Sequence, residues 1–290
     1  MEMLGIYTAY VKKLPIQQKF KEILIDKSFV DKNPIFYLQY PQLFCHAFDI
    51  EKEQVEELAI AGFLFYRSVL FLDDVADNNS LDNLPLALGC QEEAIKILAL
   101  IFDKDSEFWH LWNRRKEEYF KAILTEKTLL NQSNVSQETY LQLADLKSTF
   151  GKSAIDALHI LSHKKYTNVY EALLTSHRFF SASFQIQDDV LDFKEDFKKK
   201  QFNWAYYTLR KTTSESKDID TLNKVLYLSG TAFDLYQSAI QHCETALAVT
   251  ADIPSILWKD VVRQKIHILK QSIFAIEEYI ALLTAEVKLS

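Results

Sequence analysis

Apolar residues recur along this chain at intervals of three and four positions, and strict alternation of apolar and polar residues is rare. That period places apolar side chains on one face of an α-helix. We expect about nine or ten helices; the clearest cover residues 15–27, 35–47, 52–77, 90–102, 105–131, 136–163, 168–195, 218–249 and 254–285. Ser136 is the expected N-cap of one helix, and Pro254 the expected first turn of the last.

The composition favours long helices in one domain. Only 5 glycines and 5 prolines occur in 290 residues, so the chain has few helix breakers. The polar connections at 131–136, 162–168 and 211–220 are short, and none has the composition of an interdomain linker. With 48% hydrophobic and 13% aromatic residues the chain can form a large core and an apolar cavity. We therefore predict a single all-α domain over residues 1–290, built as a helical bundle around that cavity.

Charge and cysteine content exclude several classes of protein. The net charge of −7 disfavours nucleic-acid binding, which requires a basic surface. The N-terminus lacks the pattern of a signal peptide, and the longest nearly apolar run, 58–72, contains Arg67 and is too short for a transmembrane segment. The three cysteines, Cys45, Cys90 and Cys243, form no metal-type pairs, so we expect reduced thiols in a cytoplasmic protein.

Two acidic clusters interrupt the apolar pattern. "FLDDVADN" (71–78) and "FQIQDDVLDFKED" (184–196) both contain a DDxxD motif directly behind an apolar stretch. On a helix, Asp73 and Asp77 share one face, with Asp74 about 100° round from Asp73. Asp188 and Asp192 have the same relation. Neighbouring carboxylates repel one another unless a cation neutralises them, and oxygen-only ligands of this kind suit Mg²⁺.

A single DDxxD motif often marks no more than a solvated helix end. Two of them, each preceded by a long apolar stretch ("FLFYRSVLFL" and "RFFSASFQI"), favour two metal-binding rims at the mouth of an apolar cavity. The ligand that such a site suits has an oxyanion head for the metals and a hydrocarbon body for the cavity.

The sequence resembles the class I isoprenoid synthases over roughly residues 55–270. "FQIQDDVLDFKED" is similar to the second aspartate-rich motif of the prenyl diphosphate synthases, "LDDVADN" to the first, and "KSAIDALHIL" (152–161) to the helix that carries a diphosphate-binding lysine. The resemblance implies an allylic prenyl diphosphate substrate held by three Mg²⁺ ions. It also implies ionisation of that substrate, which releases diphosphate and leaves a carbocation in the cavity.

The resemblance assigns roles to particular residues. The implied metal ligands are Asp73, Asp74, Asp77, Asp188, Asp189 and Asp192, and the implied catalytic group is Asp73, Asp74, Asp188 and Lys152. Lys152 is the expected diphosphate ligand, with Lys147 as the alternative. Further expected substrate contacts are Gln185, Arg178, one lysine of 198–200 (Lys199 is our choice), and the wall residues Phe65 and Phe184, for which ordinary core packing is the alternative.

Two departures from the family concern a second substrate. Chain-elongating members follow the first motif with two arginines, whereas here "NNSLDNLPLALG" has no basic residue and the next one is Lys96. The N-terminal "KNPIFYLQYPQLF" offers only Lys32. A second diphosphate would lack its counter-charge, so we predict a terpene synthase that ionises and cyclises one prenyl diphosphate. The alternatives are a chain-elongating prenyltransferase with an atypical second site and a non-catalytic partner subunit; a homodimer is left open.

Overall fold

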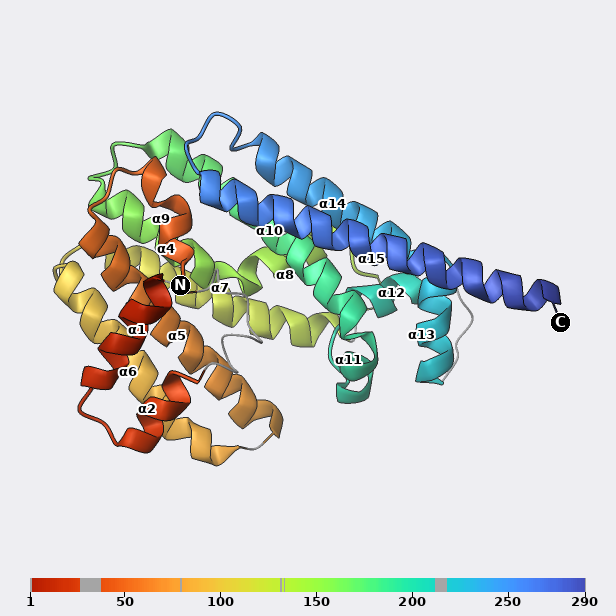
Figure 1. Ribbon diagram of the computed structural model, residues 1–290, viewed down its shortest axis with the longest axis horizontal. Helices are drawn as coiled ribbons and strands as arrows, with labels where there is room; N and C mark the ends of the chain where they lie inside the picture. Colours follow the sequence, from red (N-terminus) through yellow and green to blue (C-terminus); the bar gives the residue numbers. More distant parts are fainter. Residues whose placement is uncertain are drawn as a thin grey trace. The chain divides into compact units, whose positions relative to one another are not determined.

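The computed structural model describes residues 2–26, 38–78, 80–130, 132, 134–211 and 218–289, with only the backbone at residues 2, 76–78 and 282–289. Within these residues the chain forms α-helices and short 3-10 helices and no strand (Figure 1). The prediction of an all-α fold is confirmed. None of the described helices combines the length and the apolar character that crossing a bilayer requires.

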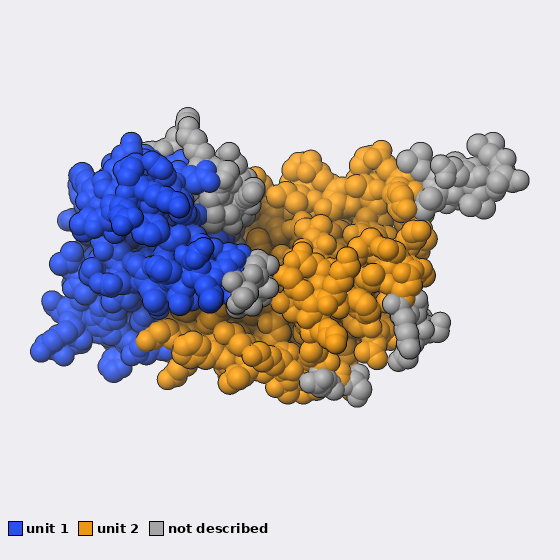
Figure 2. Space-filling view, turned by 90° about the horizontal axis from the view of Figure 1, so that it is seen from below, with its two compact units in different colours: residues 1–113, 153–170, 254–258 blue, residues 114–152, 171–253, 259–290 orange. Residues whose placement is uncertain are grey.

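The chain divides into two compact units, coloured separately in Figure 2. Unit 1 consists of residues 1–113, 153–170 and 254–258, and unit 2 of residues 114–152, 171–253 and 259–290. The expectation of one domain over residues 1–290 stays a prediction. The first aspartate motif belongs to unit 1 and the second to unit 2.

Unit 1 is built around a helical pair. Its own elements are α1 (Glu2–Lys13), α2 (Gln18–Leu24), α4 (Tyr40–Phe44), η2 (Cys45–Ala47), α5 (Lys52–Asn78), η3 (Leu81–Asn83) and α6 (Leu84–Ile101). Helix α6 packs along α5, and α1 also contacts α5, where the ring of Tyr7 meets the ring of Phe63 edge-on at 4.8 Å (Figure 1). This packing fixes α5, whose last two turns carry the first aspartate motif.

Unit 2 contains α8 (Gln137–Lys147), α11 (Phe193–Lys199), α12 (Trp204–Arg210), α13 (Ile219–Leu228) and α14 (Thr231–Ala248). Four further helices have residues in both units, namely α7 (Glu107–Leu129), α9 (Thr149–Leu161), α10 (Thr167–Leu191) and α15 (Ile256–Leu289). The short helices α11, α12 and α13 contact one another just beyond the second motif (Figure 1).

Three of the predicted long helices are interrupted, each for a local reason. The predicted helix 136–163 divides into α8 and α9 at Ser148, whose hydroxyl bonds back to the carbonyls of Ala144 and Asp145 at 3.0 and 3.2 Å. The predicted helix 218–249 divides at Gly230, which has a φ of 84° that glycine adopts without strain. The predicted helix 168–195 divides at Asp192, the N-cap position of α11.

The other boundaries follow the predictions closely at some ends and poorly at others. Helix α5 begins at the predicted residue and extends one residue further, and Ser136 caps α8 by accepting from the Thr139 amide at 3.0 Å. Helices α1 and α12 were missed, and α6 begins earlier than predicted, with Pro85 in its first turn. Part of the predicted helix 35–47 lies outside the described residues; the rest forms α4 and η2.

Candidate active site

The first aspartate motif occupies the C-terminal end of α5. The side chain of Asp73 is exposed and that of Asp74 is partly exposed, and Asn83 donates a hydrogen bond to Asp74 Oδ2 at 2.5 Å. The side chain of Asp77 lies outside the described residues. Helix C-termini carry the negative end of the helix dipole, yet the last turn of α5 contains no basic residue. Carboxylates at this position are therefore disfavoured by the helix itself and gain from a bound cation.

The second motif occupies the corresponding end of α10, which also lacks a basic residue in its last turn. Asp188 is open to solvent at its tip, but packing around it raises its pKa to about 6, and the charges of Asp192 and Asp196 contribute to the increase. Partial burial and the charge of Glu195 raise the pKa of Asp192 as well. The motif therefore concentrates negative charge that its own neighbours do not fully compensate.

Asp189 differs from these two residues because it is only 4% exposed. Its Oδ2 accepts hydrogen bonds from the Tyr140 hydroxyl and the Trp204 amide, both at 2.9 Å, and its Oδ1 accepts one from the Gln185 amide at 2.9 Å. Burial raises the pKa of Asp189 to about 7, although all three donors lower it. These bonds tie α10 to α8 and α12 and give Asp189 a structural role. Its assignment as a metal ligand stays a prediction.

The residues after the motif fold back onto it. The Asn203 side chain, only 3% exposed, donates to the backbone carbonyl of Asp189 at 2.7 Å and to the Asp196 carboxylate at 2.8 Å. The ring of Trp204 stacks on the ring of Tyr140, with centroids 4.7 Å apart. The start of α12 is thereby fixed against the end of α10, which sets the position of Asp188 and Asp192.

Of the two lysines proposed for diphosphate binding, Lys147 is the one that acts on the second motif. Although burial lowers the pKa of Lys147, Glu126 at 2.8 Å and the charges of Asp189 and Asp188 raise it. Its charge in turn lowers the pKa values of Asp188 and Asp189. Its side chain remains 35% exposed.

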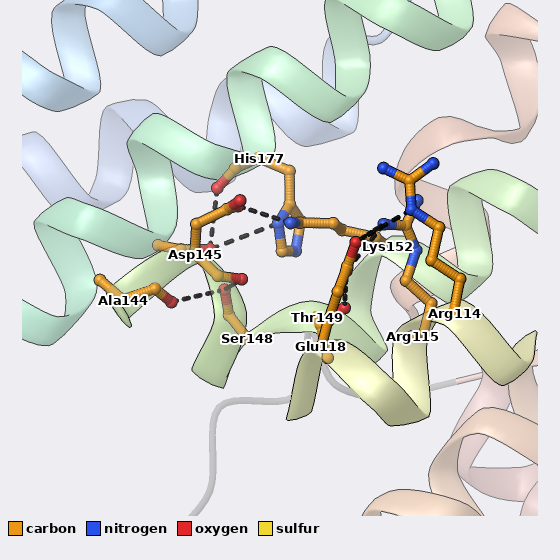
Figure 3. Close-up of polar contacts among 10 residues, drawn as sticks. Arg114, Arg115, Glu118, Ala144, Asp145, Ser148, Thr149, Lys152 and His177 are labelled. Carbon is orange, nitrogen blue, oxygen red and sulfur yellow. Dashed lines mark hydrogen bonds and ion pairs between the residues drawn. The ribbon is translucent and has the colours of Figure 1, made fainter. Parts of the chain in front are cut away.

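Lys152 is held in a different environment (Figure 3). Its side chain is 6% exposed and points toward Asp145, with Nζ 2.6 Å from Oδ1. Close by, Glu118 accepts hydrogen bonds from Arg115 at 2.9 and 3.1 Å and from Thr149 at 2.5 Å. Lys152 is thus already neutralised inside unit 2, and its role as a diphosphate ligand stays a prediction.

Comparison with solved structures identifies this architecture. The chain is similar to a polyprenyl synthase from Caulobacter crescentus, solved with calcium and isoprenyl diphosphate (TM-score 0.75, 14% identity, 92% of this chain and 94% of that chain). It is also similar to a decaprenyl diphosphate synthase from Rhodobacter capsulatus (0.74, 13%, 92% and 96%) and to a geranylgeranyl pyrophosphate synthetase from Geoglobus acetivorans (0.71, 17%, 91% and 97%).

The chain has the class I isoprenoid synthase fold. No protein-family model and no curated protein matches its sequence. At identities of 13–17% the resemblance to the solved structures concerns the fold, and the activity has to be argued from the site.

Divalent metal fits the residues at the end of α10 of this isoprenoid synthase fold. Asp188 and Asp192 are one helical turn apart, both reach solvent to some extent, and their pKa values are raised by burial and then by neighbouring carboxylates. No group of three acidic, histidine or cysteine side chains among the described residues is already arranged to hold an ion. Mg²⁺ commonly takes one or two carboxylates and completes its shell with water and substrate phosphates. Asp188 and Asp192 would hold such an ion.

The remaining predicted polar contacts lie at different distances from this motif. Gln185 is partly buried and uses its amide nitrogen on Asp189. Lys199, at the end of α11, lies 2.8 Å from Glu195, and its charge lowers the pKa of Asp192. Arg178 is exposed on α10, about 15 Å before Asp188 along the helix axis. Lys199 is therefore near the motif and Arg178 is not.

The two predicted wall residues are engaged in packing contacts. Phe65 is buried and meets the ring of Trp112 edge-on at 4.9 Å in unit 1. In unit 2 the ammonium group of Lys265 lies over the ring of Phe184, 4.2 Å from its centroid. Lys265 was not predicted. A signal for it exists in the sequence, because Lys265 falls in the otherwise apolar buried stripe of α15 formed by Val262, Leu269, Ile273 and Ile276.

Two surface grooves are lined by residues outside both aspartate motifs. One of about 660 Å³ in unit 2 is lined by residues of α7 such as Phe120 and Leu124, and one of about 900 Å³ in unit 1 is lined by Phe48, Phe102 and Tyr166 among others. Neither contains a predicted site residue. The apolar cavity expected from the sequence stays a prediction.

Proposed function

We propose that the protein binds an allylic prenyl diphosphate with Mg²⁺ and catalyses its ionisation, using the carboxylates of both aspartate motifs for the metal. The observation that carries this proposal is the accumulation of carboxylates at the end of α10, where burial and mutual repulsion raise the pKa values of Asp188 and Asp192, in a chain with the isoprenoid synthase fold. Bound metal would stabilise the charge that develops on the departing diphosphate. Lys147 would add a second positive charge.

The reaction that follows ionisation is, in this proposal, prenyl transfer. The three similar solved structures are a polyprenyl synthase, a decaprenyl diphosphate synthase and a geranylgeranyl pyrophosphate synthetase, and each match spans more than 90% of this chain. They support the chain-elongating alternative over the terpene synthase that we expected first. A carbocation formed in the site would then be attacked by a second isoprenoid diphosphate.

The terpene synthase remains the second candidate because of one observation. The first motif is followed by no basic residue before Lys96, so the usual counter-charge for a second diphosphate is missing. A protein that holds a single diphosphate would release hydrocarbon or alcohol from the allylic substrate alone.

Product analysis distinguishes the two reactions. The protein would be incubated with Mg²⁺ and geranyl, farnesyl or geranylgeranyl diphosphate, each with and without isopentenyl diphosphate. The proposal predicts a longer diphosphate only when both substrates are present. Formation of hydrocarbon or alcohol from one allylic substrate alone would contradict prenyl transfer and favour the terpene synthase. Absence of any product from all combinations would contradict both and leave the non-catalytic subunit.

A further inference from the structure

Lys265 is a buried cation with no carboxylate partner among the residues that the structure describes. It lies on α15 in a stripe of core residues, Val262, Lys265, Leu269, Ile273 and Ile276, each no more than 8% exposed. Its own exposure is 7%. A lysine is almost never placed in such a position without a paired charge, since removing an ammonium group from water is costly.

The contacts of Lys265 are with neutral groups. Its Nζ donates a hydrogen bond to Gln187 Oε1 and lies over the face of Phe184, both on α10. No carboxylate lies within ion-pair distance of Nζ among the residues that the structure describes. An ammonium group has three donors, so the bond to Gln187 leaves two for another acceptor.

The nearest negative charge belongs to the second aspartate motif. Gln187 is adjacent to Asp188 on α10, and the charges of Lys265 and Asp188 act on each other's pKa values. Burial lowers the pKa of Lys265 to about 8, while the neighbouring Cys243 and Asp188 raise it. The cation thus lies close enough to Asp188 for their charges to interact, and it lies over the ring of Phe184 one turn earlier on α10.

We infer that Lys265 is a binding residue for the diphosphate group of the substrate, donating its two remaining N–H groups to diphosphate oxygens beside the second motif. This inference rests on the proposed function. It also changes the role expected for Phe184: the ring face that would have stabilised a carbocation is covered by a resident cation. Positive charge at this wall repels a carbocation and attracts the anion, which suits a site that holds diphosphate there.

Calorimetric titration of the protein with inorganic diphosphate in Mg²⁺ tests this inference without requiring turnover. Lys265→Met keeps the length of the side chain and removes the charge. We expect it to weaken diphosphate binding about 10-fold to 100-fold, the usual value of a charge-assisted hydrogen bond. The matched control is Lys194→Met, because Lys194 is close to the motif in sequence but is exposed and pairs with Asp220 at 2.6 Å. We expect its affinity to stay within about twofold of the wild type.

Thermal unfolding without ligand separates binding from a structural role. Removal of a buried, unpaired charge should leave the unfolding temperature of Lys265→Met unchanged or raise it. Should this variant fail to fold, Lys265→Gln retains a donor for Gln187 and gives the same two readouts. Wild-type affinity in either folded variant, or a loss of affinity matched by a lower unfolding temperature, would overturn the inference alone. Absence of Mg²⁺-dependent diphosphate binding by the wild type would instead overturn the proposed function.

Discussion

The two aspartate motifs have the same DDxxD spacing and the same position at a helix C-terminus, but their surroundings differ. At the end of α5, Asp73 is exposed and Asp74 accepts a hydrogen bond from Asn83 in the η3 turn that follows. At the end of α10, the central Asp189 is bonded to three other residues. Asp189 thus ties the second motif to α8 and α12, whereas Asp73 of the first motif is exposed at the end of α5.

Cations also differ between the motifs. The charges of Lys147 and Lys265 act on Asp188, and that of Lys199 acts on Asp192. The sequence after the first motif has no basic residue before Lys96. The difference teaches that equal spacing does not mean equal surroundings: three lysines act on the carboxylates of the second motif, which suits the proposed binding of both metal and diphosphate there.

The largest expected effect is on turnover. Asp188→Ala should reduce prenyl transfer by at least about 100-fold, as removal of a group that stabilises transition-state charge does. Asp73→Ala should have an effect of similar size, because both carboxylates are assigned to metal. Circular dichroism should show the helical content unchanged in both. The control is Glu244→Ala, an exposed residue of α14. Turnover retained by Asp188→Ala would remove the metal assignment.

The next largest effect is on the free energy of unfolding, and it should differ between the two motifs. Asp189→Ala leaves the buried donors of Tyr140 and Trp204 without an acceptor, which should lower the free energy of unfolding by about 2–4 kcal/mol. Asp73→Ala, at an exposed helix end, should change it by less than about 0.5 kcal/mol. Urea denaturation measures both. Equal stability of the two variants would show that the difference in their surroundings has no energetic consequence.

Asp189→Asn sharpens the same contrast. Asparagine keeps an oxygen for Tyr140 and Trp204, and rotation of the Gln185 amide satisfies its nitrogen, so most of the stability should return. A variant that is stable and active would assign Asp189 to structure alone. A variant that is stable and inactive would assign it to the metal as well. The measurement is the specific activity of the folded protein.

A smaller effect is expected from the lysines of unit 2. Lys147→Met should weaken Mg²⁺-dependent diphosphate binding by about 10-fold, since it removes one charge from the edge of the motif. Lys152→Met should instead lower stability, because it leaves Asp145 without its partner at 2.6 Å. Titration calorimetry and thermal unfolding of both variants test this division. The reverse pattern would restore Lys152 as the diphosphate ligand.

The smallest effect concerns the hydrogen bond that Asn83 donates to Asp74 of the first motif. Asn83→Ala removes its hydrogen bond to Asp74, which should cost about 0.5–1.5 kcal/mol. Addition of Mg²⁺ with diphosphate should compensate for this loss, because the ion would then orient the carboxylate. Thermal unfolding with and without Mg²⁺ and diphosphate measures the effect. A loss that persists in their presence would contradict metal binding by Asp74.

Most helices and the two acidic motifs were predictable from the local sequence, whereas the partners of the site residues depend on tertiary contacts. The spacing of apolar residues predicted α5 to within one residue, whereas the single helix expected to carry both Asp188 and Asp192 ends at Leu191. Spacing within one helix does not reveal which residue of another helix lies opposite. Asp189 meets Tyr140 of α8, and Lys265 of α15 meets Gln187, across long sequence separations that no local pattern encodes.

The division of the helices shows the same limit. Glycine at position 230 is a residue type that often ends a helix. Ser148 and Asp192 are compatible with a continuing helix, and only their local geometry shows the interruption. The missed α12 is short, and the Asn203 cap that starts it also bonds to the distant Asp189 and Asp196.

The most direct test of the central claim is the release of inorganic diphosphate from an allylic prenyl diphosphate. The assay compares the wild type in Mg²⁺, the wild type in chelator and Asp188→Ala in Mg²⁺, each with and without isopentenyl diphosphate. Our account predicts that, of these three samples, only the wild type in Mg²⁺ releases diphosphate. Release that persists in chelator or in Asp188→Ala, or no release by the wild type with any allylic chain length, would contradict it.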